Sequence, residues 1–497
     1  MDILFVNVGG IKKRIYQELS KDYSAIEPPF FAALIAGFIR KKGFSVNILD
    51  ANAENLDIEE TAKKIEEINP KFVNIVVYGQ NPSASTSLMV GVELLCKKIK
   101  KKNPERKIIL TGLHPSALPK RTLTEVECDF VCEGEGFYTI LELIQGKELS
   151  NIKGLWYKKD NQIFGNLRQD NVKDLNKELS EVAWDLLPMR KYKAHNWHCF
   201  HDFNSRNSYA AISTSLGCPF NCSFCCINAP FGKHYYRNWN AEWVINQIDI
   251  LVNKYDIKNL KIIDELFIYK PEHFIPILEK IIKRRYKLNI WAYARVDTTK
   301  EDYLKLLKKA GFNWLAIGIE SGSDDIRKKM FKGCFEKEDI KEIVNRIKEA
   351  DINVGGNYIF GLPGDTLESM KKTLDLALEL NCEYSNFYCA MAYPGSKLYE
   401  EYQGKGILPD DDGGPGWIGY SQYSYETLPL PTESLSPAEI LKFRDEAFQK
   451  FFTNPKYLDM IEKKFGIDAR KHIEEMTQIK IKRKIVDEFY DKRENNQ

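Results

Sequence analysis

Short apolar runs alternate with longer amphipathic stretches over the first 145 residues of the chain. The short runs are typical of buried strands, and apolar positions at helical spacing occupy the stretches between them. Strands separated by helices predict right-handed crossovers and a doubly wound parallel sheet, which binds ligands beyond the carboxyl ends of its strands. The expected strands are 3–7, 45–50, 72–78, 107–111 and 130–132, and the helices include 29–42 and 85–102.

A second series of the same kind begins near residue 210. Six parallel strands in sequence predict a partial or full β/α barrel, whose chemistry lies at the carboxyl ends of its strands. The expected strands are 210–213, 259–263, 289–293, 314–319, 353–359 and 386–390. We therefore expect an α/β protein with a Rossmann-like domain at 1–145, a linker with a small hairpin at 146–205, a TIM-like barrel at 206–395 and a mainly helical region at 396–497, which is a candidate substrate lid.

Composition, net charge and the distribution of apolar residues exclude some classes of function but do not identify one. The chain of 497 residues has 72 Lys and Arg against 70 Asp and Glu, and this balance argues against nucleic-acid binding. The basic run at 97–102 has no interleaved aromatic residues and is expected to be the solvated end of a helix. Neither a secretory leader nor an apolar stretch of about 18 residues is apparent, so we expect a cytoplasmic protein without a membrane span.

Four of the 11 cysteines crowd into one short segment, which is more typical of a metal site than of disulfides. Cys218, Cys222 and Cys225 have the spacing C-x3-C-x2-C. Three thiolates can bind three irons of a [4Fe–4S] cubane and leave the fourth iron open, whereas ferredoxin-type clusters use four cysteines. The alternatives are a zinc site, with Cys226 or His234 as fourth ligand, and a purely structural role. Cys226 directly follows Cys225, so it reaches the same ion only with strain.

This cysteine segment, with an aromatic residue before its last cysteine, resembles the radical SAM superfamily. The resemblance implies that the amino and carboxylate groups of S-adenosylmethionine (SAM) chelate the open iron, and that one electron splits SAM to a 5′-deoxyadenosyl radical. Segments after the second, fourth and fifth barrel strands match as well, although Asn357 replaces a family glycine. Arg295 is expected either to meet the SAM carboxylate or to be a salt-bridged barrel residue. The implied SAM site comprises Phe224, Asp264, Glu265, Arg295, Glu320, Ser321, Tyr358 and Gly361.

A doubly wound domain before such a barrel is similar to the cobalamin-dependent class B branch of this superfamily, from the first strand to residues 393–396. The chain lacks the D-x-H-x-x-G loop whose histidine ligates cobalt, so no lower axial ligand is assigned. We expect His114 to pack against the corrin or to be a structural turn residue. Thr111 and residues 78–81 depart from the family pattern, which leaves a reshaped nucleotide pocket or loss of the cofactor as alternatives. The implied cobalamin site comprises Gly9, Gly10, Asp50, Gly79, Gln80, Asn81, Gly112, Leu113, His114, Glu133, Gly134 and Glu135.

The resemblance implies C-methylation of an unactivated carbon, with one SAM methylating cobalt and a second SAM giving the radical that abstracts a substrate hydrogen. One alternative is a cobalamin-binding radical SAM enzyme that does not methylate, such as an oxidative cyclase or a rearrangement catalyst. A second alternative is a non-catalytic cobalamin or cluster sensor. The expected partners are a small-molecule substrate and an external electron donor such as flavodoxin or ferredoxin.

Overall fold

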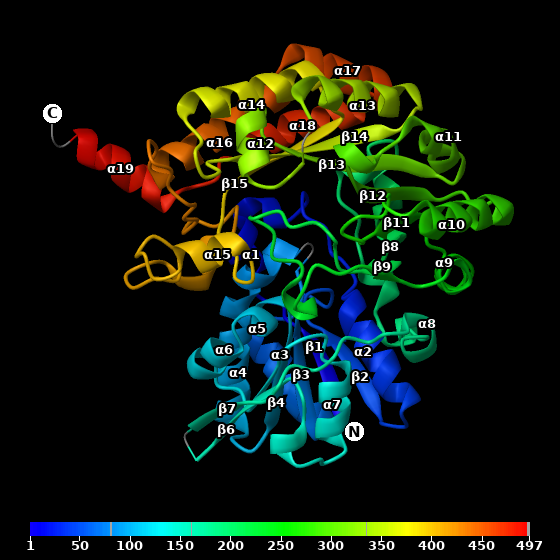
Figure 1. The fold of residues 1–497 in the computed structure, drawn as a ribbon, viewed down its shortest axis with the longest axis vertical. Helices are drawn as coiled ribbons and strands as arrows, with labels where there is room; N and C mark the ends of the chain where they lie inside the picture. Colours follow the sequence, from blue (N-terminus) through cyan, green and yellow to red (C-terminus); the bar gives the residue numbers. More distant parts are fainter. Residues whose placement is uncertain (80–81, 161, 334, 495–497) are drawn as a thin grey trace.

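The computed structural model describes residues 1–79, 82–160, 162–333 and 335–494. The first domain is built on a parallel sheet (Figure 1). The strands β1 (Ile3–Asn7), β2 (Val46–Asp50), β3 (Phe72–Val77), β4 (Lys107–Gly112) and β5 (Phe130–Cys132) pair in the order β2-β1-β3-β4-β5. Helices α2 (Phe30–Lys41) and α7 (Phe137–Ile144) share one core with Ile3 and Phe5, whereas α3 (Ile58–Ile68) and α4 (Met89–Lys102) share another with Leu4 and Val6. Both faces of the sheet are therefore covered, and the expected doubly wound sheet is confirmed.

The hairpin expected in the linker forms the edge of this first sheet. Its strands β6 (Leu155–Lys159) and β7 (Gln162–Gly165) pair antiparallel to each other, and β6 pairs antiparallel with β5. The Trp156 ring lies where a side chain on Gly165 would stand, so the tight packing of the two strands depends on glycine. The first sheet therefore has seven strands, of which the last two run against its parallel part.

The second sheet is an open, six-stranded parallel barrel. Its strands β8 (Tyr209–Ile212), β11 (Asn259–Ile262), β12 (Asn289–Arg295), β13 (Phe312–Glu320), β14 (Asn353–Phe360) and β15 (Tyr384–Cys389) pair in sequence order. Within the described residues β8 does not pair with β15, so the barrel is partial. The helices that alternate with these strands are α9 (Ala241–Tyr255), α10 (Pro271–Arg284), α11 (Glu301–Lys309), α13 (Lys337–Glu349) and α14 (Leu367–Leu380).

Aromatic residues fill the barrel near the amino ends of its strands. Trp197, from the linker, lies 5.0 Å from Trp291 and 5.1 Å from Trp314 between ring centroids, and it stacks on Tyr384. Large apolar rings in such an arrangement leave no room for a ligand. Ligand space is consequently confined to the carboxyl ends of the strands, as the barrel architecture requires.

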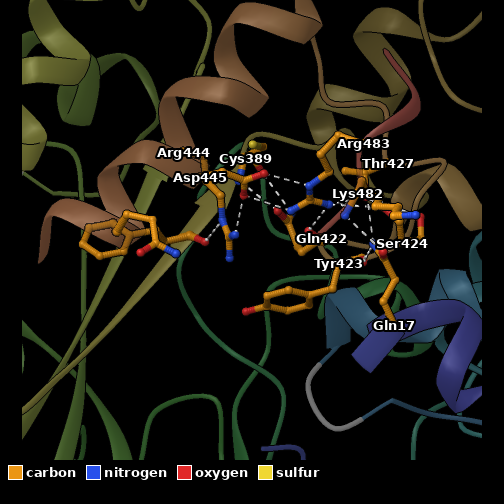
Figure 2. Close-up of polar contacts among 12 residues, drawn as sticks. Gln17, Cys389, Gln422, Tyr423, Ser424, Thr427, Arg444, Asp445, Lys482 and Arg483 are labelled. Atoms are coloured by element: carbon orange, nitrogen blue, oxygen red, sulfur yellow. Dashed lines mark hydrogen bonds and ion pairs between the residues drawn. The ribbon is translucent and has the colours of Figure 1, made fainter. Parts of the chain in front are cut away.

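The C-terminal region packs on β15 and reaches back to the start of the chain. It comprises α15 (Lys397–Tyr402), α16 (Pro437–Phe452), α17 (Pro455–Phe465), α18 (Ile467–Gln478) and α19 (Lys484–Glu494). Figure 2 shows that Arg483 holds Asp445 of α16 and the backbone of Gln422, while the Gln422 side chain brackets the backbone of Cys389 at the end of β15. Gln17 donates to the carbonyls of Tyr423 (2.8 Å) and Lys482 (3.1 Å), so the tail also holds the N-terminal segment.

The remaining elements are short. They are α1 (Lys12–Tyr16), α5 (Leu113–Ala117), α6 (Pro119–Glu125), α8 (Leu175–Glu178), α12 (Asp324–Lys329) and a two-stranded ribbon of β9 (Ser215–Leu216) and β10 (Arg237–Asn238). In the part of the chain that the structure describes, no helix has the length and apolar character of a membrane span.

Candidate functional site

One cavity joins the carboxyl ends of the two parallel sheets. From the first sheet it is lined by residues that follow β1, β2 and β3, including Gly9, Asn52 and Gly79. From the barrel it is lined by Ile263 and Glu265, which directly follow β11. The site therefore lies where both architectures place their ligands.

The cysteine segment lies on the loop between β9 and β10, beside this cavity. Cys218, Cys222 and Cys225 are partly exposed free thiols, whereas Cys226 is buried. The Asn228 side chain fixes the loop, because it accepts from the Cys218 N–H at 3.2 Å and donates to the Cys218 carbonyl at 3.0 Å. Cys226 is thus buried in the core of the first domain, against which the partly exposed Cys218 and Cys225 also pack.

The donor set, three partly exposed thiols on one loop, fits an iron–sulfur cubane. Among the residues that the structure describes, no three His, Cys, Asp or Glu side chains are gathered as ligands of one ion. The three cysteines of a cubane bind three different irons, so their sulfurs stand farther apart than the ligands of one ion. His234, the alternative zinc ligand, contacts Asn228 at 2.8 Å. The exposed thiol triplet fits a [4Fe–4S] cluster with one open iron.

The two acidic residues after β11 have different surroundings. Asp264 is buried and accepts hydrogen bonds from the N–H and Oγ1 of Thr214 (2.5 and 2.6 Å) and from Ser215 Oγ (2.6 Å). Its carboxylate therefore holds the turn that leads into the cysteine loop. Glu265 instead lines the cavity, and burial, together with the nearby Asp264 charge, raises its pKa to about 8. A cationic ligand group is the natural partner of Glu265, which fits the SAM ammonium expected there.

Arg295 lies at the cysteine loop and is salt-bridged as well. Its guanidinium stands 3.8 Å from the centroid of the Phe220 ring, and Nη1 lies 3.5 Å from Cys222 Sγ. It also pairs with Asp297 at 2.7 Å. The salt-bridged interpretation thus describes the free protein, and contact with the SAM carboxylate stays a prediction.

Glu320 has an unexpected partner in Lys332, at 2.7 Å. Glu320 has a left-handed backbone (φ 65°), and a side chain on Gly318 would collide with its carboxylate and with the Lys332 ammonium. The sequence analysis missed Lys332 because no motif contains it. Lys332 is buried, which by itself lowers its pKa, but the nearby Glu320 and Cys222 raise the pKa overall. These surroundings are visible only in the fold.

The other residues of the expected SAM site divide between the barrel mouth and the core. Phe224 packs against Leu362 and Ala390 after β14 and β15, so it lies near the segment expected to meet adenine. The Tyr358 ring is buried and stacks on Phe387, and Gly361 packs against Ile440 of α16. The buried Ser321 hydroxyl lies 3.3 Å from Thr373 Oγ1. Side-chain contact of Ser321 and Tyr358 with SAM is thus not favoured by the geometry of the free protein.

Glycines allow backbone segments at the carboxyl edge of the first sheet to approach one another closely. A Cβ on Gly112 would stand 2.3 Å from the Val77 carbonyl, and its φ of 133° is accessible to glycine alone. A Cβ on Gly9 would stand 2.5 Å from the Ala51 carbonyl, and Gly134 has a φ of 106°. Gly79 lines the cavity. Because Gly79 has no side chain, it leaves room in the cavity for a corrin, so this part of the predicted site fits cobalamin.

Most other residues of the expected cobalamin site have protein partners. Asp50 is buried and accepts from Asn7, Ala53 and Tyr192. His114 lies edge-on to Trp417 at 4.5 Å, and burial lowers its pKa to about 3, so it is neutral. The remaining placements are these: Leu113 is buried, Gly10 has a positive φ, Glu133 binds Trp156 and Arg168, Glu135 pairs with Arg237, and Gln80 and Asn81 lie outside the described residues.

Comparisons with known proteins agree with this geometry. Residues 212–377 match the Radical SAM superfamily, and residues 22–144 match the B12 binding domain. An uncharacterized methyltransferase of Pyrococcus horikoshii is 30% identical over 439 residues, which cover 87% of this chain and 89% of that protein. The anaerobic magnesium-protoporphyrin IX monomethyl ester cyclase of Rubrivivax gelatinosus is 24% identical, over 87% of this chain and 75% of the cyclase. In fold, the chain is similar to the radical SAM methyltransferase TsrM of Kitasatospora setae with cobalamin and a [4Fe–4S] cluster bound (TM-score 0.67, 16% identity, 92% of this chain and 90% of TsrM).

Proposed function

The chain belongs to the cobalamin-dependent radical SAM family of enzymes, and on this premise we propose that it transfers a methyl group to an unactivated carbon of a small-molecule substrate. Its cofactors are a [4Fe–4S] cluster, SAM and cobalamin. When bound, the cluster with SAM supplies a carbon radical that abstracts hydrogen, and cobalamin supplies the methyl group.

The observation that carries this proposal is the cavity between the two carboxyl edges. Its walls include Gly79, on the edge that fits a corrin, and Glu265, beside the cysteine loop. A substrate carbon in this space can face both cofactor sites without leaving the protein. The apolar side chains in the cavity wall, such as Ile15 and Phe31, would leave a radical few polar groups with which to react.

The roles of the chain's own residues follow from their positions. Cys218, Cys222 and Cys225 hold the cluster, and Asn228 fixes their loop. Glu265 provides a carboxylate for the SAM ammonium, because burial without a counter-ion otherwise leaves it protonated near neutral pH.

We propose an external electron donor with an acidic surface, docking over the cysteine loop. Phe331 is 58% exposed, and the Lys397 ammonium lies 5.1 Å from the centroid of its ring. The adjacent residues hold the loop directly, because Ser223 N donates to the Met330 carbonyl at 3.1 Å and Leu398 N donates to the Ser223 carbonyl at 3.0 Å. The charged residues that line this surface are Lys329, Lys397, Glu401 and Glu433, and acidic residues of a flavodoxin or ferredoxin would contact the two lysines. The proposal includes a cytoplasmic location, where such donors work and thiols stay reduced.

Anaerobic reconstitution with iron, sulfide, cobalamin and SAM tests the proposal. With a reductant, the wild-type protein is expected to release 5′-deoxyadenosine. Cys222→Ala is expected to abolish this product while cobalamin remains bound, and Cys226→Ala serves as the matched control because it changes a neighbouring thiol outside the cluster loop's exposed triplet. Absence of 5′-deoxyadenosine from the wild-type protein would instead favour a non-catalytic sensor.

The similarity to the Rubrivivax cyclase favours oxidative cyclisation as a second function. Product mass separates the two reactions. A substrate that gains one CH2 unit supports methylation, whereas loss of hydrogens or gain of oxygen supports cyclisation.

A further inference from the structure

The cavity has an acidic end and a basic end. Glu265 forms the acidic end, beside the cysteine loop, and Lys12 lines the cavity on α1 of the first domain. The walls include apolar side chains, such as Ile15, Phe31 and Ile263. Glu27 also lines the cavity, but its carboxylate is neutralised by the Lys261 ammonium at 2.7 and 3.0 Å. The charge left for a ligand at the Lys12 end is therefore positive.

Two further cations reinforce Lys12. Lys193 is joined to Ile26, the neighbour of Glu27, by two backbone hydrogen bonds of 2.9 Å. Burial, with the charges of Lys193 and Arg206, lowers the pKa of the Lys12 ammonium to about 8. Within the described residues, none of these three cations is in a salt bridge with a carboxylate. The cluster, defined as Lys12, Lys193 and Arg206, thus carries three positive charges, and the nearby Asp22 carboxylate acts on Lys193 and Arg206 without forming a salt bridge.

Arg206 carries the second, independent sign of a missing anion. Its side chain is only 6% exposed, and it donates to two neutral groups, the carbonyls of Ala194 and Asp22, both at 2.9 Å. Its Nη2 has no hydrogen-bond partner in the described structure. A buried guanidinium with one unused nitrogen and no carboxylate partner is costly to keep. Of the three cations, Lys12 lines the cavity, and the charges of Lys193 and Arg206 act on it, so an anion bound at Lys12 reduces their mutual repulsion.

The helix that carries Lys12 is anchored to the C-terminal region. Gln17, directly after α1, is held by the carbonyls of Tyr423 and Lys482, within the polar network of Arg483 and Asp445 (Figure 2). An anchored helix keeps the Lys12 backbone in place, so less conformational entropy is lost on binding an anion than at a lysine on a mobile segment.

We propose that this cavity binds a substrate with an anionic group, a carboxylate or a phosphate, on an apolar body, and that Lys12 holds the anionic group. The inference rests on the proposed function, because it takes the cavity to be the substrate site. The substrate then lies with its charge at the linker side and its reacting carbon towards Glu265.

Reaction with pyridoxal 5′-phosphate tests the proposal without knowledge of the substrate. This anionic aldehyde condenses with an unprotonated lysine amine, releasing water and forming an imine that borohydride reduces to a stable amine. Pyridoxal is the matched neutral probe. In the cobalamin-loaded enzyme, peptide mass mapping is expected to show that the phosphate probe labels Lys12 about tenfold faster than pyridoxal does, because a charged contact contributes at least this factor. The exposed Lys13 is the internal control and is expected to show no such preference.

The charge cluster and the chemical class of the anion are tested by variants and competitors. Lys193→Met is expected to reduce the preference for the phosphate probe while the protein stays folded, since Lys193 is partly exposed. Protection by inorganic phosphate alone assigns a phosphate site, and protection by acetate as well assigns a site that accepts carboxylates.

Two results would overturn the proposal. One is equal labelling of Lys12 by both probes. The other is that Lys12 prefers the phosphate probe in the enzyme loaded with cobinamide but loses this preference in the enzyme loaded with cobalamin. The anion that Lys12 binds would then be the phosphate of the cobalamin nucleotide. Formation of 5′-deoxyadenosine by the same preparation tests the proposed function separately, so either hypothesis can fail alone.

Discussion

A buried ion pair joins the first domain to the segment that carries the cysteines. Glu135, in the loop after β5, pairs with Arg237 on β10, and only 6% and 5% of the two side chains are exposed. Glu135 also accepts from the Val172 N–H at 2.7 Å. Because β10 pairs with β9, which leads directly into the cysteine loop, we expect this ion pair to support both the domain contact and the cluster.

Replacing Glu135 with Gln leaves the Arg237 guanidinium buried without a counter-charge. Removal of one partner from such a pair costs about 3–5 kcal/mol. Glu133→Gln is the matched control, because Glu133 pairs with Arg168 at 3.2 Å where 21% and 28% of the side chains are exposed. A pair as exposed as that contributes about 0–1 kcal/mol. We therefore expect the two variants to differ by about 3 kcal/mol in stability.

Urea unfolding followed by tryptophan fluorescence measures this difference, and iron content after reconstitution reports on the cluster. The double variant Glu135→Leu with Arg237→Met removes both charges and is expected to recover most of the lost stability. Equal unfolding midpoints for Glu135→Gln and Glu133→Gln, with equal iron retention, would refute the reasoning.

Three further predictions concern the sheet edge and the electron donor. Burial raises the Asp50 pKa to about 6, so the folded protein keeps a proton between about pH 4 and 6 that the unfolded chain loses, and its stability falls as pH rises through this window. Asp50→Asn, which can still bond Tyr192, is expected to be more stable than the wild type by up to about 3 kcal/mol at pH 7.5 and by little at pH 4, as measured by urea unfolding. Gly112→Ala is expected to lose cobalamin in gel filtration, whereas Gly43→Ala, with φ 92° and open space around it, is expected to lose only stability, about 1–2 kcal/mol. Lys397→Glu is expected to slow 5′-deoxyadenosine formation with flavodoxin but not with dithionite, and equal rates with both reductants would exclude the proposed docking surface.

The sequence predicted the parallel strands well because most are short, largely apolar segments that lie between amphipathic helical stretches. β1 and β5 begin and end at the expected residues, and the other strands shift by a few residues at their ends. The hairpin was expected in a linker because its own pattern does not reveal which strand it pairs with; its pairing with β5 is a tertiary contact. The cysteine triplet was readable from spacing alone.

The cavity residues were harder to predict, because their importance depends on charge that remains unpaired after folding. Lys12 and Lys193 are ordinary lysines in the sequence, and only the fold brings their charges together with Arg206. Conversely, the chemical type of Asp50, Asp264 and Glu135 suggested ligand contacts, but in the folded protein their carboxylates accept hydrogen bonds from protein donors. The sequence pattern identifies side chains that could bind a ligand. Only the folded structure shows whether such a side chain already has a hydrogen-bond or salt-bridge partner within the protein.

The two ends of the cavity come from different parts of the chain, and this has a consequence for specificity. Glu265, at the acidic end, follows the barrel strand β11. The position of its carboxylate is constrained by the cysteine loop and by a cofactor of fixed shape. The basic end is built from α1 and from the linker, whose Lys193 and Arg206 are held by the backbones of Ile26 and Asp22 and belong to no strand of either sheet. Loops tolerate change far better than packed strands. We therefore expect that an exchange of charge at Lys12 and Lys193 alters which substrates bind, with Glu265 and the cysteine loop left as they are. Substrate selection would then be separable from radical formation within one cavity.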